Sequence, residues 1–156
     1  MSETKPYGSS LDQWNETREI TFQMVKEMPD DIDVNWKPHP DMNELGKLLR
    51  HTVGSVYFMF NKYLKRNVNV PSEYNDIKIF TKELFDRELK VTNSMVKNLI
   101  NELTPEDLKK EAYIWKNRQY LVEWVVWNLK GHERWHQAQI KMYMKLMGLD
   151  TSKIGH

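Results

Sequence analysis

Hydrophobic residues recur along this chain at the three- and four-residue spacing of an α-helix, rather than alternating as in β-strands. The first such segment predicts a helix over 10–28, which stops before Pro29. Its start resembles a capping box, with Ser10 as the cap and Gln13 reaching back to it. A second helix is predicted over 41–66, and its apolar residues cover most of its circumference. That distribution is typical of a helix inside a bundle.

Two further helices are predicted in the second half of the chain. The third carries apolar residues at seven-residue spacing from Ile77 and continues to Leu99. The fourth begins near Gln119 and ends at Gly148, a residue type that readily adopts the left-handed conformation found after a last helical turn. All four predicted helices are long and amphipathic.

Proline and polar residues mark the connections between these helices. The prolines of 29–41 forbid a continued helix, and Asp41 with Glu44 gives a capping signature for the second helix. The sequence of 104–107 predicts a short helical turn with proline at its first position. The segment 111–118 lacks the helical pattern and is expected to be extended or irregular.

The predicted elements define a fold class. Four long helices without a convincing strand pair predict an all-α fold, a four-helix bundle in which residues 1–156 form a single domain. The connections before the second and fourth helices are longer than an up-and-down bundle needs, so we expect long crossover loops.

Composition excludes several classes of protein. The chain has 23 Lys and Arg against 22 Asp and Glu, so it lacks the basic excess of a nucleic-acid-binding surface. It has no Cys, which excludes disulfides and thiolate ligands and suits a reducing compartment. The longest apolar runs, Val56–Phe60 and Trp124–Trp127, are too short to cross a bilayer, and no secretory signal is expected. We therefore expect a cytoplasmic protein that binds neither nucleic acid nor a membrane.

Two histidines of the fourth predicted helix share one face. His132 and His136 are four residues apart, so their side chains diverge by only about 40°. Two neighbouring buried imidazoles leave ring nitrogens to satisfy, and one divalent cation would satisfy both. Interior histidines that find ordinary hydrogen-bond partners are the alternative interpretation. The apolar residues on the same side of the helix are Val125, Leu129, Ile140, Tyr143 and Met147.

The remaining histidines supply one further candidate ligand. His51 lies at the margin of the apolar arc of the second predicted helix, a position that suits an open site at one end of a bundle. His39 lies between two prolines, and His156 ends the chain.

The segment from His132 to His136 also matches the HExxH pattern of zinc proteases, in which the glutamate is the general base. Only 20 residues follow His136, which leaves little chain for the downstream ligand of such enzymes. Glu133 is predicted to point toward the polar flank of the helix. It is a surface charge, a residue that positions a ligand, or a catalytic base, and the sequence leaves these alternatives open.

Three stretches give the chain a likeness to a known family. They are Trp36-Lys37-Pro38, the segment LGKLLRHTVGSVYFMF at 45–60, and the segment WNLKGHERWHQAQI at 127–140. In these stretches the chain resembles the DinB-like (DinB/YfiT) superfamily of metal-binding four-helix bundles. The likeness spans nearly the whole chain.

The resemblance implies a site of His51, His132 and His136 that binds Ni, Zn or a similar divalent ion, and it implies a homodimer. Characterised members include thiol-dependent transferases that use low-molecular-weight thiols such as mycothiol or bacillithiol. Gln137-Ala138 stands where family members often have Arg-Gly, which leaves the substrate class open.

The leading hypothesis from the sequence is a metal-dependent thiol S-transferase or hydrolase that acts on small molecules. The alternatives are a non-catalytic metal- or ligand-binding stress-response module and a purely structural helical dimer. Trp124 and Trp135 lie within about 20° of each other on the fourth helix, which favours a second buried side and a dimer seam. The residues expected to line a substrate pocket, each of which ordinary core packing would also explain, are Tyr57, Phe58, Trp135, Gln139 and Tyr143.

Overall fold

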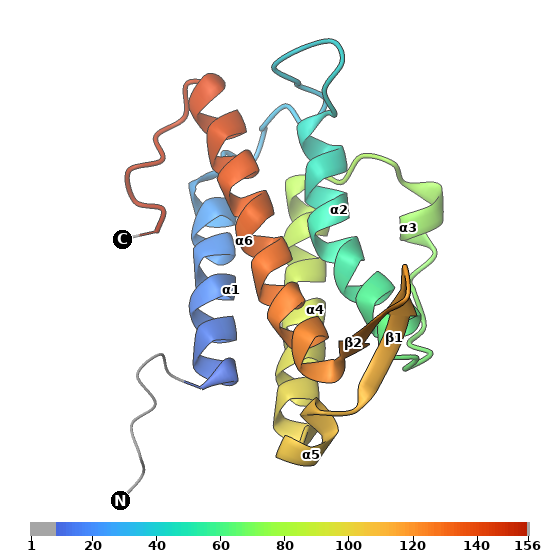
Figure 1. Ribbon diagram of the computed structural model, residues 1–156. Helices are drawn as coiled ribbons and strands as arrows, with labels where there is room; N and C mark the ends of the chain where they lie inside the picture. The colour runs from blue at the N-terminus through green and yellow to red at the C-terminus, as the bar shows by residue number, and fades with distance from the viewer. Residues whose placement is uncertain (1–8, 156) are drawn as a thin grey trace, which may run out of the picture.

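The computed structural model describes residues 9–155 of the chain, and four long helices dominate it (Figure 1). These helices are α1 (Ser10–Glu27), α2 (Leu45–Phe58), α4 (Lys82–Glu102) and α6 (Val122–Leu146). Helices α1 and α2 occupy opposite corners of the bundle, because each of them contacts both α4 and α6. The predicted all-α four-helix bundle is confirmed.

The connections between the helices follow from this arrangement. Helices α2 and α4 start at the same end of the bundle and run parallel, whereas α1 and α6 run the opposite way (Figure 1). The segments 28–44 and 103–121 each join helices at opposite corners, so the expected crossover loops are confirmed. The connection 59–81 returns along the outside of the bundle, where Phe80 N–H donates to the carbonyl of Gly46 at 3.0 Å.

A β-hairpin closes one end of the bundle, which contradicts the prediction that the chain has no strand pair. Strand β1 (Glu111–Trp115) pairs antiparallel with β2 (Arg118–Leu121). Lys116 and Asn117 form the turn with φ values of 48° and 60°. The ring of Tyr113 stacks on Tyr63 with centroids 4.0 Å apart, so contacts with the bundle stabilise a strand pair that would be marginal alone.

The start of the first helix differs by one residue from the prediction. Ser9, and not Ser10, caps α1: its Oγ accepts from the N–H of Asp12, and the carboxylate of Asp12 accepts from the N–H of Ser9. Asp12 therefore takes the place predicted for Gln13 in the capping box.

Helix α2 is shorter than predicted at both ends. It starts at Leu45 because the carbonyls of the preceding loop accept the first helical N–H groups, with Trp36 accepting from Leu45 at 2.9 Å. The capping role predicted for Asp41 is therefore wrong. After Phe58 the chain forms a π-helical turn, η1 (Met59–Tyr63), and the helical segment ends there rather than at residue 66.

The remaining helix boundaries follow the local capping chemistry. The third long helix was predicted to include Ile77, and this is wrong, because Ile77 ends the separate short helix α3 (Glu73–Asp76). Helix α4 begins after Thr81, whose hydroxyl accepts from the N–H of Leu84. The short helix predicted after Thr104 is present as α5 (Pro105–Leu108). Helix α6 starts three residues later than predicted because Gln119 belongs to β2. Gly148 follows it with a φ of 84°, as predicted.

The buried side chains form two clusters along the bundle. One holds residues near the shared start of α2 and α4, such as Leu45, Phe80 and Phe85, and the other holds residues near the hairpin end, such as Trp14, Val96 and Val125. None of the helices in the part of the chain that the structure describes is long and apolar enough to cross a membrane.

Candidate metal centre

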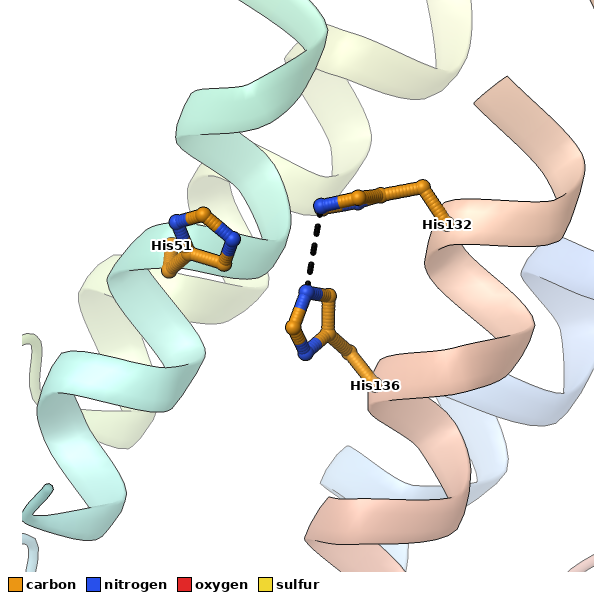
Figure 2. Close-up of side chains that lie close together, drawn as sticks. All are labelled: His51, His132 and His136. Carbon is orange, nitrogen blue, oxygen red and sulfur yellow. Dashed lines mark hydrogen bonds between the residues drawn. The ribbon is translucent and has the colours of Figure 1, made fainter. Parts of the chain in front are cut away.

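Three histidines from two helices come together at the contact between α2 and α6. His51 projects from α2, and His132 and His136 project one turn apart from α6 (Figure 2). The ring centroid of His51 lies 5.2 Å from that of His132 and 4.7 Å from that of His136. The three rings were predicted from spacing and resemblance, and the packing of α2 on α6 places them side by side.

The ring nitrogens lie at separations that suit one metal ion. The Nε2 atoms of His132 and His136 are 3.1 Å apart, and the ligand atoms of all three residues lie within 4.8 Å of one another. Imidazole nitrogens bind Zn²⁺ at about 2.1 Å, so two ligands of one ion are at most about 4.2 Å apart. The pair on α6 meets that limit, and His51 lies close to it. The three residues therefore fit a divalent cation.

A hydrogen bond orients the ring of His136. The side-chain oxygen of Gln139 lies 2.7 Å from Nδ1 of His136 and accepts a hydrogen bond from the N–H of that nitrogen. This bond leaves the lone pair of Nε2 free to point toward the other rings. Metal-binding histidines are commonly held in this way, with one ring nitrogen donating to an outer partner while the other binds the metal. The hydroxyl of Ser55, which donates its own proton to the carbonyl of His51, lies 3.4 Å from Nε2 of His132. That nitrogen is the candidate ligand atom, so this contact would give way to a bound metal.

Electrostatics keep the three imidazoles neutral at pH 7. Burial lowers the pKa of His132 to about 4, and the neighbouring His136 and His51 add to that effect. Burial also lowers the pKa of His51, with a contribution from the charge of Arg50. The pKa of His136 is lowered by burial, although the bond to Gln139 acts in the opposite direction. Neutral imidazole is the form that binds metal ions.

Two hollows open on either side of the three rings. The first, called here the Arg50 hollow, has a volume of about 800 Å³. The second, called the Trp135 hollow, has a volume of about 700 Å³. Both volumes lie in the range of small-molecule sites. His51 borders both hollows, His132 borders the Arg50 hollow and His136 borders the Trp135 hollow.

The hollows are defined by their walls. The Arg50 hollow is bounded by Arg50, His51, Ser55, Phe58, Lys62 and His132 among others. The Trp135 hollow is bounded by Leu48, His51, Trp135, His136, Gln139 and Tyr143 among others.

The five residues expected to line a pocket are divided between the two hollows. Tyr57 and Phe58 border the Arg50 hollow, and Trp135, Gln139 and Tyr143 border the Trp135 hollow. Tyr57 and Tyr143 are also buried members of the core, so each serves packing as well. Burial raises the pKa of Tyr57 to about 12, with Glu88 adding to the effect, so its hydroxyl keeps its proton at neutral pH.

Glu133 faces away from the three rings, toward α1. It is only 2% exposed, so its interpretation as a surface charge is wrong. Arg18 donates to one of its carboxylate oxygens at 2.8 Å, and the Thr21 hydroxyl donates to the other at 2.6 Å. Both oxygens are engaged inside the bundle, and this geometry gives no support to a role as general base.

The structure also shows where the other two histidines lie and adds one residue to the site that the sequence did not indicate. His39 is exposed in the loop before α2, away from the cluster, and His156 lies outside the described residues. Arg50 was not predicted as a site residue, although it precedes His51 and borders the same hollow. Its only sequence signal is its place next to a candidate ligand.

Comparisons with known proteins bear on the family and on the fold of this chain. A model of the DinB superfamily matches residues 13–140. No curated protein gives a match. A DinB-like protein from Bacillus cereus is 18% identical and has a TM-score of 0.77, with 93% of this chain and 95% of that chain covered. A DinB-like protein (YjoA) from Bacillus subtilis is 17% identical and has a TM-score of 0.67, with 89% and 92% covered.

At such identities the two structures bear on the fold alone. The family model, in contrast, covers most of the sequence, including all three histidines of the cluster. This chain belongs to the DinB superfamily.

Proposed function

We propose that this protein is a metal-dependent thiol S-transferase whose metal is held by His51, His132 and His136. The observation that carries the proposal is the meeting of three neutral imidazoles between two hollows of small-molecule size. A structural zinc site is closed by four protein ligands, whereas catalytic sites keep a position open. Three imidazoles at the junction of two hollows match the second pattern.

Zn²⁺ and Ni²⁺ are the metals that the ligand set favours. Imidazole suits both ions, and the chain has no Cys that would select a softer metal. When bound, such an ion supplies a Lewis acid with an open position that lowers the pKa of a thiol or of water. The chain's own residues hold the imidazoles neutral and, through Gln139, fix the orientation of His136.

The presence of two hollows favours transfer between two molecules over hydrolysis. One hollow has space for a thiol and the other for an electrophile, and the His51 ring lies between them. In the reaction the thiol loses its proton to solvent, and its sulfur forms a bond to carbon of the electrophile. The bond from that carbon to the leaving group breaks, and the leaving group departs with the electron pair.

The test begins with metal analysis of protein purified without a His-tag and without chelator. We expect close to one Zn or Ni per chain, in line with one histidine cluster. The metal-loaded protein is then assayed with 1-chloro-2,4-dinitrobenzene and a panel of low-molecular-weight thiols. Chloride displacement above the uncatalysed rate, lost with EDTA and restored by metal, supports the proposal.

Other outcomes of the same assay separate the alternatives. Bound metal without turnover by any thiol contradicts the transferase and leaves a non-catalytic metal-binding module. Release of chloride without any thiol identifies a hydrolase. Protein that carries no metal and melts at the same temperature with and without EDTA is a structural helical protein.

We also propose that the protein is a homodimer that pairs through an exposed apolar face of α6. Trp127 and Trp135 are 61% and 69% exposed, and Met142 and Leu146 lie within about 100° of them around the helix. Trp124 belongs elsewhere, because it packs on the hairpin rings of its own chain. The four exposed side chains offer roughly 600 Å² of apolar surface, close to the roughly 800 Å² per partner of a standard interface. A second copy of the same helix is the partner that presents a matching face.

A further inference from the structure

The charged residues around the Arg50 hollow have one sign. Arg50 and Lys62 border this hollow, and no aspartate or glutamate is among the residues that line it. A hollow with apolar walls and charge of one sign concentrates ligands of the opposite charge. The polar groups that complete its lining are uncharged amides, hydroxyls and imidazoles.

Arg50 has hydrogen-bonding capacity that the protein itself does not use. Its Nη2 donates to the backbone carbonyl of Tyr74, and its buried Nε has no hydrogen-bond partner. Within residues 9–155 the guanidinium forms no ion pair with a carboxylate, since the ion pairs of the structure involve other basic residues. A carboxylate in the hollow would be held by the remaining N–H groups of the guanidinium, which no carboxylate of the described residues engages.

Arg50 also stands close to the histidine cluster, whereas Lys62 does not. Arg50 is adjacent to His51 in α2, and its charge contributes to the lowered pKa of that ring. Lys62 follows Arg50 by twelve residues of helical chain, which corresponds to roughly 18 Å along the helix axis. Of the two cations, Arg50 is therefore the one within reach of a small ligand that touches the imidazoles.

The Trp135 hollow has a different charge balance. It is bordered by both Asp41 and Lys47. Lys47 is already paired, because its Nζ lies 2.9 Å from a carboxylate oxygen of Glu44. The two hollows therefore differ in charge although they share the His51 ring.

We propose that the Arg50 hollow binds a carboxylate-bearing thiol and that Arg50 is the residue that recognises its carboxylate. The Arg50 guanidinium presents parallel N–H donors that match the two oxygens of a carboxylate. The other end of the ligand then lies against His51 and His132, and the Trp135 hollow remains available for the electrophile. This inference rests on the proposed thiol S-transferase function, because it identifies which class of thiol the site selects.

The test compares two ligands that differ only in charge. Zinc-loaded protein is titrated with N-acetylcysteine, which carries a carboxylate, and with N-acetylcysteine amide, which is neutral. Heats of binding give the two dissociation constants at pH 7 and low salt, and zinc content is measured before and after each titration. We expect N-acetylcysteine to bind about tenfold more tightly than its amide, because only its carboxylate forms charge-assisted hydrogen bonds with Arg50.

Variants then assign this preference to a residue. Arg50→Gln is expected to reduce the preference to less than twofold, and Arg50→Lys to retain part of it because the charge remains without the planar fork. Lys109→Gln is the control, since it removes an exposed cation that borders neither hollow and is expected to leave the preference unchanged. Circular dichroism establishes that each variant is folded, and Arg50→Lys replaces Arg50→Gln should the latter not fold.

The outcomes distinguish this inference from the proposed function. Zinc-loaded protein that binds both ligands equally overturns the role of Arg50 and leaves the S-transferase proposal standing. A preference that survives in Arg50→Gln also overturns it. Protein that binds no zinc overturns the inference together with the function on which it rests.

Discussion

At the scale of single residues, the histidine cluster depends on how each ring is held. His136 is oriented by Gln139, and His132 is buried deeply enough that its pKa falls to about 4. A ring that stays neutral and aimed loses less entropy when it binds a cation. In the proposed metal site, these residues would therefore act as a preformed ligand set rather than as three independent side chains.

The first prediction concerns His132. We expect His132→Ala to lose stoichiometric zinc or nickel, because it removes the ligand nitrogen that lies 3.1 Å from His136 Nε2. Metal content per chain, measured after dialysis against metal-free buffer, checks this. His39→Ala is the control, since His39 is exposed and lies outside the cluster, and it should keep its metal. Full retention of metal by His132→Ala would contradict the assignment of the site.

Part of the site was predictable from the sequence for a physical reason. The four-residue spacing of His132 and His136 fixes their relative direction on any helix, whatever the fold around it. The position of Glu133 was not predictable, because its burial depends on Arg18, which is 115 residues away in the chain. Arg50 could not be singled out either, since an arginine on a helix is usually a solvated charge.

At the scale of elements, the buried pair of Arg18 and Glu133 joins α1 to α6 at the turn that carries the two histidines. Arg18 is 1% exposed, and it also donates to the backbone carbonyl of Leu89 on α4 at 2.7 Å. Three helices are thus tied together at one level of the bundle. This tie fixes the rotation of α6 and thereby the side toward which His132 and His136 project.

The second prediction tests this tie. Glu133→Leu leaves the buried Arg18 charge without its carboxylate, and such a change typically costs about 3–5 kcal/mol of unfolding free energy. The double variant Arg18→Met with Glu133→Leu should recover much of the loss, because neither buried charge then remains. Urea unfolding monitored by circular dichroism measures both. An unchanged unfolding free energy in Glu133→Leu would show that the pair contributes little.

The elements themselves were predictable to different degrees. The long helices follow from periodicity, and the caps at Thr104 and Gly148 follow from local chemistry. The start of α2 was not predictable, because its first N–H groups donate to backbone carbonyls of a folded loop rather than to a side chain. Extended or irregular backbone was expected within 111–118, and β1 lies there. The pairing of β1 with β2 was missed because the strands are short and the turn, Lys116-Asn117, lacks the glycine that usually marks a two-residue hairpin.

At the scale of the whole molecule, the exposed face of α6 borders the site. Trp135 and Met142 belong both to that face and to the wall of the Trp135 hollow. A second copy packed on α6 would therefore cover the mouth of this hollow. In the proposed dimer, the partner chain would complete the walls of the site.

The third prediction concerns this assembly. We expect Trp135→Glu to convert a dimer into a monomer, because it places a charge in the centre of an apolar interface. Sedimentation equilibrium or light scattering gives the mass directly. Trp115→Glu is the matched control, since Trp115 is a comparably exposed tryptophan on the hairpin, and it should remain dimeric. A wild-type protein with the mass of one chain would refute the dimer.

The position of His51 between the two hollows has a consequence for how ligands bind together. In the proposed site, a molecule that enters one hollow and presses on this imidazole would alter the wall that the same ring offers to the other hollow, so we expect the two binding events to be coupled. Thermodynamic linkage requires the effect to be mutual: each molecule alters the affinity for the other by the same factor. The order in which the two reactants arrive then changes the path to the ternary complex but not its free energy.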